Sequence, residues 1–141
     1  MLKFVLGPSG SGKTSWLIGK ANEEMKSGKG RIVFIDSDND QIFSLDHAVR
    51  LIDAHDFNID NLDKFLGFIS GIISRDYDVE KVYIDGMYDI INFGDKLDGL
   101  IEGLRFLSNT NNVIIYMGMD KDESAFPEAD DIKLIKLEGA E

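Results

Sequence analysis

The sequence predicts an α/β fold, a three-layer sandwich around a mainly parallel five-stranded sheet. Short apolar runs of strand-forming residues alternate along the chain with longer segments whose apolar residues recur at helical spacing. This alternation favours parallel strands, because each helix returns the chain to the end of the sheet where the next strand begins. A length of 141 residues with 43% hydrophobic composition is enough for one core. We therefore expect a single domain over residues 1–141.

The first half of the chain predicts two strands and one helix, followed by a segment that is harder to assign. Residues 2–6 form the first strand, and residues 31–36 form a buried strand that ends in an aspartate. Between them a helix is indicated by apolar residues at helical spacing and by glycines at its end: Trp16, Leu17, Ala21, Met25, Gly28 and Gly30. Residues 37–59 are polar, but four apolar residues fit a short amphipathic helix: Leu45, Ala48, Val49 and Ile52.

The middle of the chain predicts two helices on either side of a third strand. The first helix covers residues 61–74, with one apolar stripe made of Leu62, Phe65, Leu66, Ile69, Ile72 and Ile73. Residues 81–85 form the strand, and a loop follows through residue 93. The second helix runs from about residue 95 to 108 and turns five residues inward: Leu97, Leu100, Ile101, Leu104 and Leu107.

Two more strands complete the expected sheet. Residues 112–119 form the fourth strand, and residues 120–131 form an acidic surface loop. Residues 132–137 then alternate apolar residues with lysine, as in a strand that has one exposed face. The direction of this last strand is left open, and an antiparallel arrangement is compatible with the sequence.

A complete glycine-rich phosphate-binding motif lies between the first strand and the first helix. The motif G-x-x-x-x-G-K-[ST] is formed by Gly7, Pro8, Ser9, Gly10, Ser11, Gly12, Lys13 and Thr14. Glycines allow successive backbone N–H groups to turn toward phosphate oxygens, and the start of a helix adds unpaired N–H groups and a favourable dipole. We expect Lys13 to bind the β- and γ-phosphates of a nucleotide and the Thr14 hydroxyl to ligate Mg²⁺.

An acidic residue at the end of the third strand extends this site. Asp85 follows an apolar run, Val82 to Ile84, and ligands of open α/β sheets gather at the carboxyl ends of the strands. Such an aspartate is a common turn former, but together with the phosphate loop it indicates a Walker B carboxylate that holds Mg²⁺ through water.

The order of these motifs resembles the core of the RecA-like ATPases, a branch of the P-loop NTPases. In that family a strand after the first helix ends in a phrase similar to Phe-Ile-Asp-Ala-Glu, whose glutamate orients the attacking water. The matching phrase here is Phe34-Ile35-Asp36-Ser37-Asp38. The resemblance therefore implies that Lys13 and Asp38 are the catalytic residues, with ATP and Mg²⁺ as cofactors. Asp38 is one methylene shorter than glutamate, and a turn or capping role for it stays open.

Three features depart from the family pattern or from related enzymes. Gly86 follows Asp85 where many ATPases carry a glutamate, so the usual catalytic base is absent. At the end of the fourth strand, where a polar sensor is common, the chain has Met117, Gly118 and Met119 before Asp120. None of the four arginines lies in an arginine-rich lid such as phosphotransfer kinases use.

Composition restricts the partners. A formal net charge of -11 repels a phosphate backbone and argues against a general nucleic-acid surface. With no cysteine, the chain forms neither disulfides nor thiolate metal sites, and no apolar run reaches the length of a membrane span. We therefore expect a cytoplasmic protein that does not bind membranes.

The leading hypothesis is a P-loop protein that binds ATP with Mg²⁺ and hydrolyses it slowly. Efficient turnover would require a protein partner or homo-oligomer that supplies an arginine and closes the site. Two alternatives remain: an ATP-sensing binding module without appreciable hydrolysis, and a small nucleoside or nucleotide kinase.

Overall fold

The structure is a computed structural model, and it describes residues 1–28, 30–37, 44–76 and 78–138. The described residues form one six-stranded sheet in the order β3-β2-β4-β5-β1-β6, and all pairings are parallel. The strands are β1 (Leu2–Leu6), β2 (Arg31–Asp36), β3 (Arg50–Asp53), β4 (Val79–Asp85), β5 (Ile114–Met119) and β6 (Ile132–Lys136).

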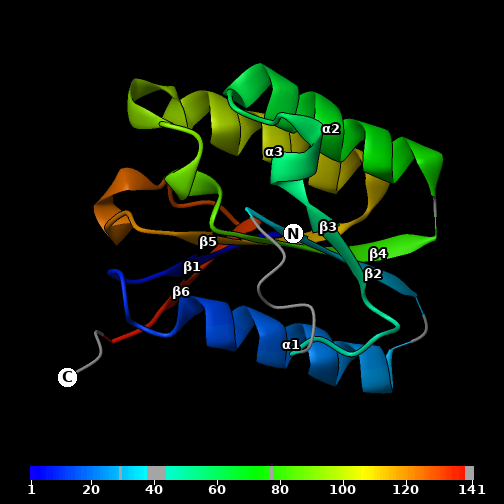
Figure 1. Cartoon of the computed structure of the whole chain (residues 1–141). Helices are drawn as coiled ribbons and strands as arrows, with labels where there is room; N and C mark the ends of the chain where they lie inside the picture. Colours follow the sequence, from blue (N-terminus) through cyan, green and yellow to red (C-terminus); the bar gives the residue numbers. More distant parts are fainter. Residues whose placement is uncertain (29, 38–43, 77, 139–141) are drawn as a thin grey trace.

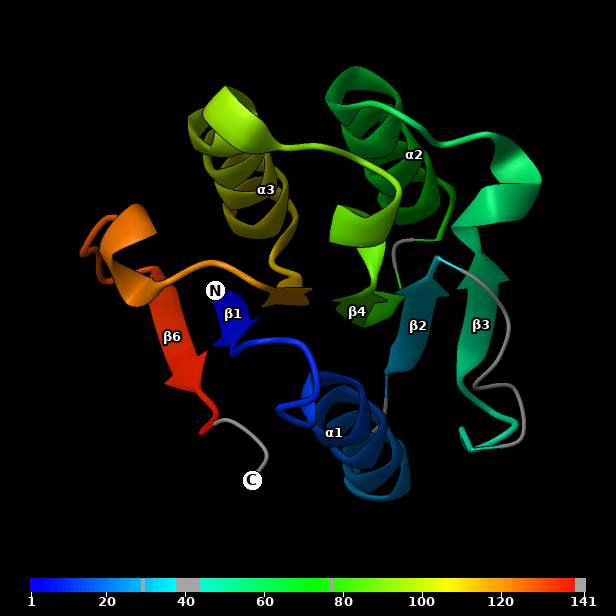
Figure 2. The same ribbon diagram turned by 60° about the vertical axis from the view of Figure 1, so that its left-hand side comes forward.

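Three helices cover the two faces of the sheet, so the expected α/β layers are present. The helices are α1 (Lys13–Ser27), α2 (Leu62–Arg75) and α3 (Leu97–Asn111). Helix α1 lies alone on one face, and α2 and α3 lie side by side on the other (Figures 1 and 2). None of the helices in the described ranges is long and apolar enough to cross a membrane.

The prediction of five strands was wrong, because residues 50–53 form β3 rather than part of a helix. The apolar residues of this region have helical spacing, but they pack on opposite sides of the sheet. Val49 and Leu51 contact the cluster beneath α1, whereas Ile52 contacts the larger cluster beneath α2 and α3. Such alternation belongs to a strand, and the four residues pair in parallel with β2.

The last strand is parallel to its neighbour, which settles the direction that the sequence left open. Residues 120–131 carry the chain back to the amino end of β1, where the Leu2 N–H donates to the carbonyl of Asp131 at 2.9 Å. From there β6 runs beside β1, with Leu2 opposite Ile132. The loop of residues 120–131 therefore acts as a crossover connection.

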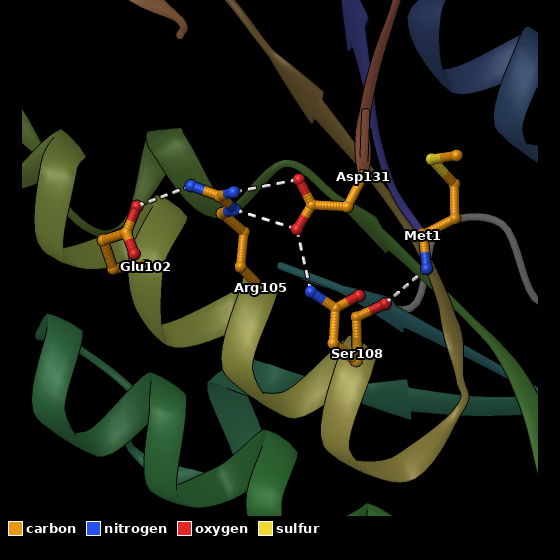
Figure 3. A network of polar contacts seen from close by, with 6 residues as sticks. Met1, Glu102, Arg105, Ser108 and Asp131 are labelled. Carbon is orange, nitrogen blue, oxygen red and sulfur yellow. Dashed lines mark hydrogen bonds and ion pairs between the residues drawn. The ribbon is translucent and has the colours of Figure 1, made fainter. Parts of the chain in front are cut away.

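A polar network fixes the amino ends of β1 and β6 to α3 (Figure 3). The Arg105 guanidinium binds both carboxylate oxygens of Asp131 at 3.0 and 2.9 Å and also contacts Glu102 at 3.0 Å. The Met1 amino group donates to the Ser108 hydroxyl at 2.9 Å, which in turn donates to the Val113 carbonyl at 2.5 Å. Because β1 leads into the glycine-rich loop, this network helps to hold the strand from which the loop emerges.

Candidate phosphate-binding site

The glycine-rich loop joins β1 to α1 at the carboxyl edge of the sheet. Gly12 is the N-cap of α1 and has a φ of 94°, a backbone conformation that glycine adopts without strain. The helix begins at Lys13, so the N–H groups of Lys13, Thr14 and Ser15 have no acceptor within the helix. No other acceptor for them is found in the described ranges, and three adjacent donors are thus available to an anion.

Lys13 is buried inside the loop that it belongs to. Its side chain is 4% exposed, and Nζ donates to the carbonyls of Gly7 at 2.5 Å and Pro8 at 3.0 Å. The ammonium also lies over the ring of Tyr88, 5.5 Å from its centroid. Burial lowers the pKa of Lys13, and the carboxylates of Asp120, Asp85 and Asp89 act against this shift. An anionic ligand would add to the charge that favours the ammonium form.

Thr14 and Asp85, both predicted as metal-binding residues, are in direct contact. The Thr14 hydroxyl donates to Asp85 Oδ2 at 2.8 Å, although strand β5 separates β1 from β4. Asp85 is 4% exposed, and this burial raises its pKa, while the hydrogen bonds from Thr14 and the Gly86 N–H lower it. A carboxylate desolvated in this way gains from a nearby cation.

A glycine on the intervening strand makes room for this contact. A Cβ atom on Gly118 of β5 would lie 3.2 Å from Leu17 Cδ1 and 3.4 Å from Asp85 Oδ1. The first distance is tighter than ordinary contact, so α1 could not pack as closely over a larger residue. Gly118, which offered no sensor side chain in the sequence, thus helps α1 and Asp85 to approach each other.

The loop opens into a pocket of about 410 Å³ that also includes a segment not predicted from the sequence. After β4, Gly86 has a φ of 71° and begins a one-turn 3₁₀ helix, Met87–Asp89. This turn brings Tyr88 and Asp89 into the pocket wall. The described residues that line it are Ser9, Gly10, Gly12, Lys13, Thr14, Ser15, Tyr88 and Asp89.

The structure does not describe Asp38, the other candidate catalytic residue. Its role as a water-orienting carboxylate therefore remains a prediction. Asp36, at the end of β2, is buried opposite Asp85 in the register of the sheet, and its Oδ1 accepts from the Ser37 N–H at 2.7 Å. The strand that leads to Asp38 therefore ends beside the strand that carries Asp85.

The residues of the site fit Mg²⁺ bound together with phosphates better than a metal held by protein alone. The described residues contain no cluster of three or more His, Cys, Asp or Glu side chains able to hold a metal. Mg²⁺ commonly uses one or two protein oxygen ligands and completes its shell with water and substrate phosphates. The Thr14 hydroxyl would be a direct ligand of this kind, and Asp85, which contacts it, would support the ion through a bound water. In the same loop, the Ser11 hydroxyl is buried without a hydrogen-bond partner among the described residues.

Comparison with models of known protein families gives no match for this chain, and comparison with curated proteins gives no significant match.

Proposed function

We propose that this chain is a Mg²⁺-dependent ATP-binding P-loop protein of the RecA-like branch that hydrolyses ATP slowly. The observation that carries the proposal is the hydrogen bond between Thr14 and Asp85, because the two residues that the motifs propose as metal-binding then lie together beside the loop. The order of elements supports the same branch: β1, loop, α1, β2 ending at Asp36, β4 ending at Asp85, and then β5.

Each part of the pocket has a role in this proposal. The free amides at the start of α1 and the Lys13 ammonium bind the phosphates. The Thr14 hydroxyl ligates Mg²⁺ directly and Asp85 supports it through water, so that Mg²⁺ offsets the charge of the phosphates. Before the phosphates enter, Lys13 must exchange at least part of its contact with the Gly7 and Pro8 carbonyls for the ligand.

A thermal-shift titration with ATP, ADP and GTP, each with and without Mg²⁺, tests the binding step. A ligand at about one hundred times its dissociation constant stabilises the fold by about 2.7 kcal/mol. Lys13→Ala should abolish the shift, whereas Lys26→Ala, which changes an exposed lysine at the other end of α1, should leave it intact. Failure of every nucleotide to shift the wild-type melting temperature would refute the proposal.

Hydrolysis is a separate test. Phosphate release above background that disappears in Lys13→Ala supports an ATPase. ATP binding without release, alone or at concentrations that favour self-assembly, would support the ATP-sensing module instead. One observation favours that alternative: Gly86 occupies the position after Asp85 and serves as the N-cap of a 3₁₀ turn, so no carboxylate is present there.

A further inference from the structure

The water-orienting carboxylate that the resemblance implies, Asp38, lies outside the described residues, and the position after Asp85, where many ATPases carry a glutamate, has no carboxylate. Asp85 is committed to Thr14, and Gly86 has no side chain. A water that attacks the γ-phosphate approaches in line with the leaving oxygen. The loop amides and Lys13 hold the phosphates from one side, so the acceptor for this water is best sought in the part of the pocket wall that the loop does not form.

Among the described residues, Tyr88 and Asp89 form that part of the wall. Of these two, Asp89 carries a carboxyl group, whose two oxygens can accept hydrogen bonds. Asp120, the next carboxylate along the carboxyl edge after β5, also acts on the charge of Lys13, but it lines the neighbouring pockets rather than this one. On these grounds we propose that Asp89 accepts a hydrogen bond from the attacking water and orients it toward the γ-phosphate. The inference rests on the proposed function of the loop.

The backbone around Asp89 is well anchored although its side chain is exposed. Met87 and Ile91, on either side of it, are buried in the core beneath α2 and α3. The Asp89 N–H donates to the Gly86 carbonyl at 3.0 Å, and the Ile91 N–H donates to the Met87 carbonyl at 2.8 Å. A carboxylate held on such a turn is better positioned than one on an unsupported loop.

The charge of Asp89 acts on both proposed parts of the site. It acts against the lowering of the pKa of Lys13 by burial, and it adds to the raised pKa of Asp85. Its own carboxylate makes no hydrogen bond or ion pair with any residue in the described ranges. Its oxygens are therefore available to accept from water.

The reaction that Asp89 would assist is the transfer of the γ-phosphoryl group to water. The water oxygen forms a bond to the γ-phosphorus as the bond from that phosphorus to the β–γ bridging oxygen breaks. The proton that the water loses passes to the Asp89 carboxylate and then to solvent. The products are the nucleoside diphosphate and inorganic phosphate, and no further reactant is needed.

The test compares Asp89→Asn with Asp89→Glu and with Asp95→Asn, which changes an exposed aspartate outside the pocket. Each purified full-length variant is assayed for ATP-dependent thermal shift and for single-turnover phosphate release at saturating ATP and Mg²⁺. We expect Asp89→Asn to keep the thermal shift and to lose about a hundredfold in the rate of release, the lower end of the usual range for such groups. Asp89→Glu should recover part of the rate, and Asp95→Asn should match the wild type.

Three outcomes overturn the inference, and they are distinguishable. If Asp89→Asn releases phosphate at the wild-type rate, Asp89 does not orient the water and the proposed function stands. If the wild type binds ATP without releasing phosphate, there is no attack for Asp89 to assist. If the wild type shows no thermal shift with any nucleotide, the proposed function fails and the inference fails with it.

Discussion

The Thr14 hydroxyl and the Asp85 carboxylate form a hydrogen bond of 2.8 Å across 71 residues of sequence. The bond joins the first turn of α1 to the end of β4, and it satisfies one oxygen of a carboxylate that is almost fully buried. It makes the stability of the protein and its proposed affinity for Mg²⁺ depend on the same two side chains.

Thr14→Val removes the hydroxyl and keeps the size of the side chain. We expect the free energy of unfolding without ligand to fall by about 1–3 kcal/mol, because a buried acceptor loses its partner. The Mg²⁺-dependent part of the ATP-induced thermal shift should also disappear. Thr14→Ser keeps the hydroxyl and should preserve both properties. An undiminished Mg²⁺ effect in Thr14→Val, measured by the same titration, would argue against metal binding at Thr14.

Asp85→Asn should have opposite effects on the free and the ligand-bound protein. Burial raises the pKa of Asp85 above its ordinary value of 3.8, so the folded state binds a proton more tightly than the unfolded state does. The contribution of Asp85 to stability therefore falls as pH rises through the interval between 3.8 and the raised pKa. Without ligand, Asp85→Asn should be more stable than the wild type at neutral pH, because asparagine does not ionise.

Urea unfolding of the wild type and of Asp85→Asn across this pH range measures the difference in the free energy of unfolding. This difference should vanish below pH 3.8. With ATP and Mg²⁺ the order should reverse, because the variant lacks the charge that supports the metal. A variant that is less stable than the wild type at neutral pH without ligand would show that burial does not dominate at Asp85.

The parts of the site that follow a local pattern were predictable from the sequence. The loop and the start of α1 depend on residues that are adjacent in the chain, and Asp85 ends a strand with an apolar pattern. The α/β class followed from alternating periodicities. The boundaries of the helices moved by a few residues, since α3 runs from Leu97 to Asn111 rather than from about residue 95 to 108.

The parts that were missed depend on geometry that periodicity does not express. Tyr88 and Asp89 reach the pocket because Gly86 adopts a positive φ and turns the chain, and the sequence offered a glycine after a strand as the only sign of this. Strand β3 is four residues long, too short for its alternation to outweigh an accidental helical spacing. The direction of β6 is decided by where residues 120–131 return the chain, which is a tertiary property.

Two glycines on neighbouring helices should respond to alanine in opposite ways. Gly67 of α2 is exposed and has open space where a Cβ would lie, so Gly67→Ala should stabilise the fold by about 0.5–1 kcal/mol. Gly103 of α3 faces Leu66, and an added Cβ would lie 2.6 Å from Leu66 Cδ1. The overpacking costs about 1–3 kcal/mol and is partly offset by the same gain in helix propensity, so Gly103→Ala should destabilise the fold by about 0.5–2 kcal/mol.

A double-mutant cycle with Leu66→Ala identifies the cause of the second effect. If the clash with Leu66 is responsible, Gly103→Ala should cost less in the Leu66→Ala background than in the wild type. Chemical denaturation of the four proteins measures the coupling. An equal cost in both backgrounds would assign the effect to another neighbour of Gly103.

The contact between Arg105 and Asp131 should stabilise the fold in a pH-dependent way. Hydrogen bonds from Arg105, and then from Asn109, lower the pKa of Asp131 from 3.8 to about 2. The folded state therefore releases this proton more readily than the unfolded state, and the stabilisation is complete above 3.8 and is lost as pH falls toward 2. Arg105→Met should be less stable than the wild type at neutral pH, with a difference that shrinks through this interval. In an NMR titration of this variant, the Asp131 carboxyl should titrate closer to 3.8.

Lys136→Met is the control, because it breaks an exposed ion pair with Glu123 and should change stability by less than about 1 kcal/mol. A difference between Arg105→Met and wild type that persists undiminished in acid would show that packing of the arginine stem, rather than its charge, holds the amino end of β6 to α3.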